Sequence, residues 1–464
     1  MLKVAIIGAG FSGTMAAVHL MRQTDNPVHI TLFDQRDCIA KGVAYNPYSS
    51  KHLLNVTTSK MSAFPDLPGH FLDWVKRHPA YEDIESHLVA NSFLPRKLYG
   101  DYLSDIWTLA KDSMPEMHRI IEKNSCIVDL QHSTDGYILT DAHDNTFEAQ
   151  KVLLATGNET PGDVQDVDFS TLDNSVYFRN PWDNKCVLGT DPSLPILILG
   201  NGLTMVDTVI GLRENGFKNI IYSLSPNGFQ ILPHRHPGLD YNIIQNDIES
   251  ANSLLDLVRI TNRHIKKIRS LGISAEPIIN ALRSQTPDIW KRLTDEEKKI
   301  FYRRIRHLWG VARHRLPLHI HDEIQNERIR GTLKVYSGRV TNVEQVQDGI
   351  IIKYLNKKSR THQKVFVSRI INCTGPVTDL LTSRNTLLAN LVRKNFIEQD
   401  PLRLGINADS ETYIASKNGN LVEGLYIIGS LLKGVLWEST AVGELRQQAQ
   451  QVSKTILRSL HYTS

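Results

Sequence analysis

The sequence has few cysteines, no long apolar run and little net charge, and each shortage excludes a class of protein. Its four cysteines, Cys38, Cys126, Cys186 and Cys373, are scattered and include no C-x-x-C pair, which argues against a disulfide framework or a dithiol redox centre. No run of about 18 apolar residues is present, so no membrane-spanning helix is predicted. Because the chain opens directly on an apolar strand, we expect no signal peptide and a cytoplasmic location.

Charge and size indicate a soluble protein with at least two domains. The 53 basic and 49 acidic residues leave a formal net charge of +4, which is too small to indicate nucleic-acid binding. The 464 residues exceed one ordinary core, and 41% of them are hydrophobic. We therefore expect a small-molecule substrate and neither nucleic acid nor membrane as partner, and we leave homo-oligomerisation open.

Two His-x-His pairs come closest to a metal-binding pattern. They are His234 with His236, and His319 with His321. Neither pair has a convincing third ligand at local spacing, so no metal site is predicted.

The first strong pattern is a glycine-rich turn. An apolar strand runs straight into G-x-G-x-x-G, where the first glycine makes the tight turn, the second lets the backbone approach a pyrophosphate, and the third lets the helix pack close to the sheet. The phosphates then lie at a helix N-terminus. The position of this turn at the start of the chain favours FAD. The cofactor-binding candidates here are Gly8, Gly10, Phe11, Ser12 and Gly13.

The residues after this turn support the same interpretation. Residues 29–33 are typical of a second strand, which ends at Asp34 with Gln35 beside it. An acid about twenty residues past the last glycine is expected to bind ribose hydroxyls. A glycine turn in an unrelated α/β protein is the alternative, and the combination of strand, glycines and acid makes it the weaker one.

A second turn of the same kind follows at residues 195–205. Its apolar strand leads into Gly200 and Gly202, Thr204 stands near the helix start, and Met205 replaces the third glycine. Two such turns imply two dinucleotides, with FAD at the first and NADPH or NADH at the second.

The residues that would select between NADH and NADPH are ambiguous. The next strand, residues 219–225, is followed neither by an acid that favours NAD nor by an arginine that favours NADP. The sequence offers only Ser223 and Ser225 on the strand, with Arg213 and Arg235 somewhere near. The choice of nicotinamide stays open at this stage.

Two further apolar strands end in a small-residue turn, one at Gly157 and one at Gly375. In two-dinucleotide flavoproteins such turns mark the chain crossings between the FAD and nicotinamide domains. An ordinary strand-loop junction is the alternative for either turn alone. Their placement on both sides of the second nucleotide turn favours the crossings.

The C-terminal region is expected to complete the flavin end of the FAD domain. A strand ends in another turn at Gly429 and Ser430, and a helix is expected to start near Ser439 or Thr440. Such a helix would aim the positive end of its dipole at the flavin pyrimidine, where the reduced ring carries charge.

The sequence pattern predicts an α/β, two-dinucleotide-binding-domain (Rossmann-like) flavoprotein with a helical insertion at about 242–322. We expect an FAD-binding domain over 1–190, an NAD(P)-binding domain over 191–370, and a return to the FAD domain over 371–464. The insertion holds a basic stretch at 301–315. It is either a solvated face of an amphipathic helix or a lid that supplies cations to a substrate or to NADP phosphate.

With these motifs in place, the sequence resembles bacterial FAD/NAD(P)-binding proteins that include the FAD-dependent urate hydroxylase, and more remotely the ornithine and lysine N-hydroxylases. The likeness runs nearly end to end. It rests on the first glycine turn and on residues 42–45, 52–56, 61–65, 70–74, 95–103, 200–207, 313–315, 372–376 and 437–442.

The resemblance implies that the loop from residue 52 to residue 62 lies along the isoalloxazine, with Asn55, Met61 and Ser62 as contacts. Two departures matter. The basic residues often found after the second strand of the nicotinamide half are Pro226 and Asn227 here, which puts an NADP preference in doubt. Ser430 stands where many flavoproteins place an acid, although its hydroxyl can still form a hydrogen bond.

The function expected from these features is a FAD-dependent, NAD(P)H-using monooxygenase that hydroxylates a small polar nitrogen compound through a peroxyflavin. The candidate catalytic residues are His52, Asn55, His70 and Arg96. The histidines titrate near working pH, and Arg96 offers a cation to an anionic substrate. A purely structural role for each histidine stays open, as do two other functions: an NAD(P)H:acceptor oxidoreductase without oxygen insertion, and a non-enzymatic flavin-binding redox sensor.

Overall fold

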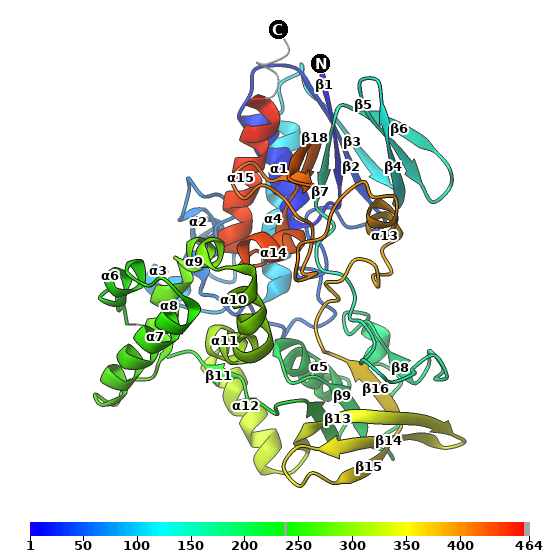
Figure 1. The fold of residues 1–464 in the computed structure, drawn as a ribbon, viewed down its shortest axis with the longest axis vertical. Helices are drawn as coiled ribbons and strands as arrows, with labels where there is room; N and C mark the ends of the chain where they lie inside the picture. The colour runs from blue at the N-terminus through cyan, green and yellow to red at the C-terminus, as the bar shows by residue number, and fades with distance from the viewer. Residues whose placement is uncertain (236–238, 459–464) are drawn as a thin grey trace. The chain divides into compact units, whose positions relative to one another are not determined.

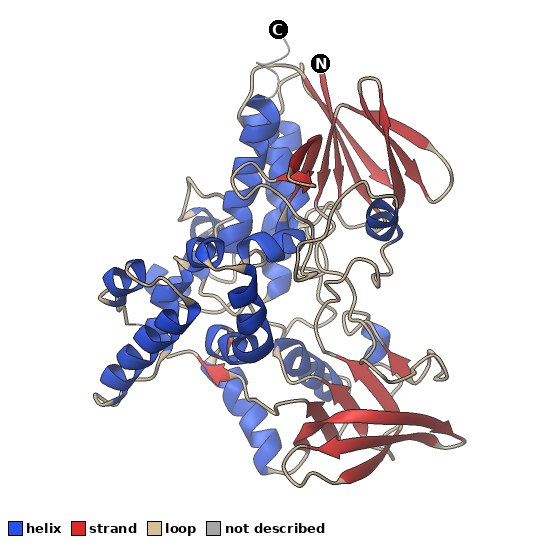
Figure 2. Cartoon of the chain, viewed as in Figure 1, coloured by secondary structure: helices blue, strands red, loops and turns tan. Residues whose placement is uncertain are grey.

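The computed structural model describes residues 1–235 and 239–458, which form two compact units (Figures 1 and 2). Unit 1 combines Met1–Glu159 with Val377–Ser464, and unit 2 is Thr160–Pro376. The chain therefore passes between the units just after the turns at Gly157 and Gly375. The boundaries expected at 190/191 and 370/371 differ, because residues 160–190 carry a strand that pairs within the sheet of unit 2.

Unit 1 is built on a mostly parallel sheet in the order β17-β18-β7-β1-β2-β3. β17 pairs antiparallel with β18 at one edge. The strands are β1 (Leu2–Ile7), β2 (Val28–Asp34), β3 (Arg119–Asn124), β7 (Lys151–Leu154), β17 (Ile414–Lys417) and β18 (Asn420–Ile427). The two strands expected around the first glycine turn, β1 and β2, are therefore neighbours that pair in parallel, from Leu2 with Val28 to Ile7 with Phe33.

Alternate residues of β1 face opposite cores, because successive side chains of a strand point to opposite faces. Val4 and Ile6 pack in the core that holds α1, α4 and α15, whereas Ala5 and Ile7 pack with the small antiparallel sheet and α13. The two sets of elements lie on opposite sides of the strands of unit 1 (Figure 1). The helices are α1 (Phe11–Arg22), α4 (Arg96–Asp112), α13 (Thr386–Arg393) and α15 (Val442–Arg458). Cover on both faces is what a parallel sheet requires.

The remaining elements of unit 1 are short. The small antiparallel sheet consists of β4 (Ile127–Ser133), β5 (Gly136–Asp141) and β6 (Thr146–Ala149). Short helices are α2 (His70–Lys76), α3 (Ser86–Ala90) and α14 (Lys433–Leu436), with 3₁₀ turns at Thr58–Lys60 and Gly429–Leu432.

The sheet of unit 2 has the order β15-β14-β13-β10-β9-β16-β8. β8, β16, β9, β10 and the first part of β13 run parallel, and β13 then continues into an antiparallel meander with β14 and β15. The strands are β8 (Tyr177–Phe178), β9 (Ile196–Leu199), β10 (Ile221–Ser225), β13 (Leu333–Val346), β14 (Gly349–Asn356), β15 (His362–Val367) and β16 (Arg369–Asn372). α5 (Leu203–Glu214) follows β9.

A set of helices is inserted between β10 and β13, where the sequence pattern placed it. They are α6 (Ile244–Glu249), α7 (Leu254–Arg269), α8 (Glu276–Arg283), α9 (Thr286–Arg292), α10 (Asp295–Ile300), a π-helical turn (Phe301–Ile305), α11 (Arg306–Arg313) and α12 (Leu318–Ile329). A two-residue parallel pair brackets α6 to α11: β11 (Leu232–Pro233) with β12 (Arg315–Leu316). No helix among the described residues is long and apolar enough to cross a membrane.

A buried histidine on α1 makes the stability of unit 1 sensitive to acid. His19 is 2% exposed and packs edge-on against Phe64. Burial, helped by the charge of Arg22, lowers the pKa of His19 to about 4 from 6.5. Between these two pH values the unfolded chain binds the proton more readily than the folded chain. The free energy of unfolding should therefore fall by about 3 kcal/mol as the pH drops from 6.5 to 4.

Urea denaturation at pH 7 and pH 4.5 measures this effect. His19→Leu should lose less stability between the two pH values than the wild type, because the variant has no imidazole to protonate at this position. His143→Leu, at an exposed histidine in the turn between β5 and β6, is the control and should behave like the wild type. An equal loss in the wild type and His19→Leu would contradict the account.

Candidate cofactor sites

The first glycine turn is packed so closely at Gly8 and Gly13 that a side chain at either position would clash. Gly8 has φ +102°, and a Cβ added there would lie 2.3 Å from the Ala155 carbonyl oxygen at the end of β7. A Cβ on Gly13 would lie 1.9 Å from the Gly8 carbonyl oxygen. A Cβ on Gly10 would lie 3.4 Å from Gly42 Cα, so a second glycine segment closes over the turn. The Phe11–Ser12 pair starts α1.

The acid at the end of β2 lies beside this turn, as expected. Asp34 is buried, and its Oδ2 accepts a hydrogen bond from the Ala9 N–H at 3.0 Å. Arg36 also binds this carboxylate, with Nε on Oδ1 and Nη2 on Oδ2, both at 3.0 Å. Gln35 is exposed. Sequence reasoning named the acid and missed Arg36, although the arginine follows only two positions later.

Segments from both ends of the chain meet at the first turn within unit 1. A Cβ on Gly429 would lie 3.6 Å from Ser12 Oγ, and the Gly429 N–H donates to Gln448 Oε1 on α15 at 2.9 Å. The Ser430 hydroxyl donates to the Gly157 carbonyl oxygen. The residues that the sequence pattern assigned to FAD from three separate segments are therefore brought together.

The C-terminal helix begins later than expected. α15 starts at Val442, whereas a start near Ser439 or Thr440 was expected, because the short helix α14 and the positive φ of Trp437 precede it. Thr440 is exposed. Ser439 is fully buried, and its hydroxyl has no hydrogen-bond partner among the described residues, as is also true of the Thr156 hydroxyl. Thr156 lies beside the first turn, with its Cα 3.1 Å from a Cβ added on Gly8.

The loop from residue 52 to residue 62 is fixed by α4 and the residues before it. The Leu54 N–H donates to the Leu94 carbonyl at 2.9 Å, and Arg96 Nε donates to the Leu53 carbonyl at 2.9 Å. Met61 lies in the core, and the Ser62 hydroxyl donates to the Leu67 carbonyl at 2.6 Å. The side chains of Met61 and Ser62 are buried in the protein. A cofactor could therefore contact these two residues only through their backbone atoms.

The proposed catalytic side chains divide into buried and partly accessible ones. His52 is buried against the ring of Tyr48, with 4.8 Å between ring centroids. His70 is partly buried, and its Nδ1 lies 2.8 Å from the Tyr102 hydroxyl. Burial, with a smaller effect from the charge of Arg77, lowers the pKa of His70. Asn55 is half-buried. His52 and His70 thus pack against or bond to other side chains of the protein. Arg96 holds the loop in place through its hydrogen bond to the Leu53 carbonyl.

The second glycine turn repeats the construction of the first. Gly200 has φ +105°, and a Cβ there would lie 2.3 Å from the Cys373 carbonyl oxygen at the end of β16. Met205, in the third glycine's place, is buried and tolerated. A Cβ on Gly202 or on Gly375 would meet no atom within 4 Å. The carbonyl of Thr204 accepts the Thr208 hydroxyl at 2.8 Å. The second turn is therefore packed against Cys373 at Gly200 and has free space beside Gly202.

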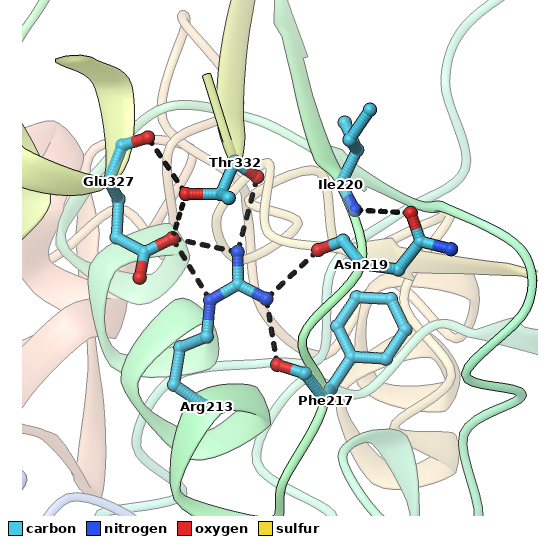
Figure 3. Close-up of polar contacts among 6 residues, drawn as sticks. All are labelled: Arg213, Phe217, Asn219, Ile220, Glu327 and Thr332. Atoms are coloured by element: carbon cyan, nitrogen blue, oxygen red, sulfur yellow. Dashed lines mark hydrogen bonds and ion pairs between the residues drawn. The ribbon is translucent and has the colours of Figure 1, made fainter. Parts of the chain in front are cut away.

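Two residues considered for nicotinamide selection have other roles. The buried Ser223 hydroxyl donates to the Gly200 carbonyl at 3.0 Å and so holds the second turn. Arg213 lies at the opposite, amino edge of the sheet. Figure 3 shows its guanidinium on Glu327 and on the carbonyl oxygens of Phe217, Asn219 and Thr332. Arg213 is therefore not part of the nucleotide site.

Removing Arg213 should destabilise unit 2 without affecting nucleotide binding. Burial alone would raise the pKa of Glu327, but hydrogen bonds from Arg213 and Thr332 outweigh burial and leave this pKa below its usual range. Arg213→Met strands the carboxylate and should cost about 3 kcal/mol of unfolding free energy at pH 7, measured by urea denaturation. The double variant with Glu327→Leu should recover part of the loss. Weaker nucleotide binding in a stable Arg213→Met protein would contradict this assignment.

The basic stretch and the histidine pairs show no metal-binding arrangement in the part of the chain that the structure describes. No residue of 301–313 is fully buried, which fits a solvated basic face. Arg315 is the exception nearby: it is 5% exposed, with Nη1 3.8 Å from Glu276 Oε2. Glu276 also accepts the Arg235 N–H at 2.7 Å. His236 lies outside the described residues.

Comparison with known proteins agrees with this geometry. Residues 5–159 match the FAD-NAD(P)-binding family model. The matched segment contains the first glycine turn, Asp34 and the turn at Gly157, and it confirms the predicted class of cofactor, FAD with NAD(P). No curated protein sequence matches the chain.

Solved structures of flavoproteins share the fold along nearly the whole chain. The ornithine N-hydroxylase of Kutzneria sp. 744 is 14% identical, with 98% of this chain and 99% of that chain covered and a TM-score of 0.66. The L-lysine 6-monooxygenase of Pseudomonas syringae is 12% identical, with 99% of this chain and 100% of that chain covered and a TM-score of 0.66. The thioredoxin reductase of T. acidophilum is 11% identical, with 99% of this chain and 100% of that chain covered and a TM-score of 0.52. The likeness confirms the predicted two-dinucleotide architecture.

Proposed function

We propose that this protein is a FAD-dependent, NAD(P)H-using monooxygenase that hydroxylates the nitrogen of a small polar amine. The observation that carries the proposal is the repeated glycine turn, closed against Ala155 in unit 1 and against Cys373 in unit 2. One chain thus offers two dinucleotide sites, which is the requirement for passing a hydride from nicotinamide to flavin.

The residues of unit 1 fit FAD. The turn from Gly8 to Gly13 and the start of α1 would hold the pyrophosphate, and Asp34 with Arg36 would hold the ribose. Ser439 and Thr156 supply two buried hydroxyls that have no partner among the described residues. Bound FAD would supply the electron transfer and the activation of oxygen.

An aromatic wall beside the first turn can exclude water. Phe11 begins α1, and its ring lies 6.5 Å from that of Tyr99, which in turn is 4.6 Å from Tyr45 and 5.4 Å from Tyr102. Tyr99 is fully buried, and burial raises the pKa of its phenol well above the usual value. The same burial keeps water away from these rings, and dry apolar surroundings suit oxygen activation.

An amine substrate is favoured by the solved structures with the same fold, which include an ornithine N-hydroxylase, an L-lysine 6-monooxygenase and a cadaverine monooxygenase. The reaction would consume one NAD(P)H, one O₂ and one proton, and it would yield the hydroxylated amine, NAD(P)⁺ and water. A thiol-disulfide reductase is the other candidate, because reductases share the fold. All four cysteines are free in this structure and no C-x-x-C pair exists, which weighs against it.

Substrate-coupled oxygen consumption tests the proposal. The purified holoprotein would be mixed with NADPH or NADH and a panel of ornithine, lysine, cadaverine and urate. One amine should raise oxygen consumption and yield its hydroxylated product in step with NAD(P)H oxidation. A flat response to every amine, together with rapid reduction of a quinone, would replace the monooxygenase by an acceptor oxidoreductase. Coupling to urate alone would transfer the proposal to purines.

A further inference from the structure

A cation reaches the second nucleotide site from a distant part of the chain. β10 ends at Ser225, which is in register with Ser337 of β13. The meander then returns so that Asn356, the last residue of β14, pairs with Gly338. The turn over residues 357–361 therefore lies at the carboxyl edge of the parallel strands, beside the loop that follows β10.

Hydrogen bonds and close packing hold this turn against that loop. Lys357 N–H donates to the Ser337 carbonyl at 2.8 Å, and Lys357 Nζ donates to Asn227 Oδ1 at 2.8 Å. The Ser337 hydroxyl donates to the Pro226 carbonyl at 3.2 Å. A Cβ on Gly228, which has φ +61°, would lie 3.0 Å from Ser337 Cβ, so the two segments are in close contact. Asn227 thus holds the ammonium group of Lys357 over the end of β10.

The end of the second strand is where a Rossmann-type half receives the adenine ribose, and a cation there accommodates a 2′-phosphate. The loop itself, residues 225–230, carries no charged side chain. It therefore has no carboxylate to bind the 2′-hydroxyl of NAD or to repel a phosphate. The turn over 357–361 is exposed and also carries Lys358 and Arg360, which adds positive charge at the same edge.

We propose that Lys357 binds the 2′-phosphate of NADPH and makes the protein prefer NADPH to NADH. This assignment rests on the proposed function, because it takes the Gly200 turn as the nicotinamide nucleotide site. The cation that sequence reasoning sought after β10 comes instead from the meander, and Asn227 positions it.

Binding of two nucleotide fragments to the holoprotein tests the assignment without any turnover. Adenosine 2′,5′-bisphosphate carries the 2′-phosphate and 5′-AMP lacks it, and isothermal titration gives the affinity for each. The wild type should bind the bisphosphate about tenfold more tightly, as expected for one charge-assisted contact. Lys357→Ala should remove this preference, and Lys357→Arg should keep it.

Lys364→Ala is the matched control, because Lys364 is also exposed, lies on β15 of the same meander and changes the net charge equally. It should leave the preference unchanged. Equal affinity of the wild type for both fragments, or an undiminished preference in Lys357→Ala, would overturn the role of Lys357 alone. Failure of the wild type to bind either fragment would instead contradict the nucleotide site at Gly200 and with it the proposed function.

Discussion

Replacing Gly13 by alanine is expected to abolish FAD binding and to destabilise unit 1. The added methyl group would lie 1.9 Å from the Gly8 carbonyl oxygen and 3.1 Å from an Ile6 methyl carbon, so α1 must move away from the strand. A backbone displacement of this kind costs about 3 kcal/mol or more. The displaced helix N-terminus no longer aims its amides at a pyrophosphate.

The flavin content of the purified protein, read from its visible absorbance, measures the first effect, and urea denaturation measures the second. Gly310→Ala serves as the control, because Gly310 lies within α11 with open space around its Cα, and alanine favours a helix. That variant should keep its flavin and its stability. A Gly13→Ala protein that retains a full complement of FAD would show that the first turn does not hold the cofactor.

Replacing Gly202 by valine is expected to leave the fold and the flavin intact and to stop reduction by nicotinamide. A Cβ at this position meets no atom within 4 Å, and the backbone has φ −95° and ψ −169°, an extended conformation that valine adopts readily. The branched side chain would fill the space that a pyrophosphate needs at this turn. Loss of about 3 kcal/mol of binding corresponds to an affinity lower by about a hundredfold.

Anaerobic mixing with NADPH or NADH, followed by the flavin absorbance, gives the rate of reduction. Gly202→Val should be slower by about a hundredfold at low nucleotide concentration, with unchanged flavin content. Gly202→Ala should fall between the variant and the wild type, because its side chain is smaller. Unimpaired reduction in Gly202→Val would place the nicotinamide elsewhere.

Local patterns made the two turns predictable. Gly8 and Gly200 have positive φ, and a carbonyl oxygen lies where a Cβ would be. Only glycine tolerates both conditions, so the glycines alone indicated the two turns. The end of β2 at Asp34 followed from hydrophobic alternation and spacing. The small-residue turns at Gly157 and Gly375 immediately precede the two points where the chain passes between the units, and Ala155 and Cys373 just before them close the glycine turns.

Long-range contacts could not be predicted from the same patterns. Lys357 and Asn227 are 130 residues apart in the chain. Their side chains meet only because β14 runs antiparallel to β13 and ends beside the loop that follows β10. The sequence pattern also gave no direction to the side chains of Met61 and Ser62, since a loop has no periodicity that distinguishes inside from outside. Arg213 is near β10 in sequence but lies at the amino edge of the sheet, where Glu327 binds it.

Anaerobic titration of the purified protein with NADPH tests the central claim, that one chain brings FAD and a nicotinamide nucleotide together for electron transfer. The account predicts a protein that carries about one FAD per chain and whose visible flavin absorbance is bleached by one equivalent of NADPH. A protein without flavin, or a flavin that neither NADPH nor NADH bleaches, would contradict the account.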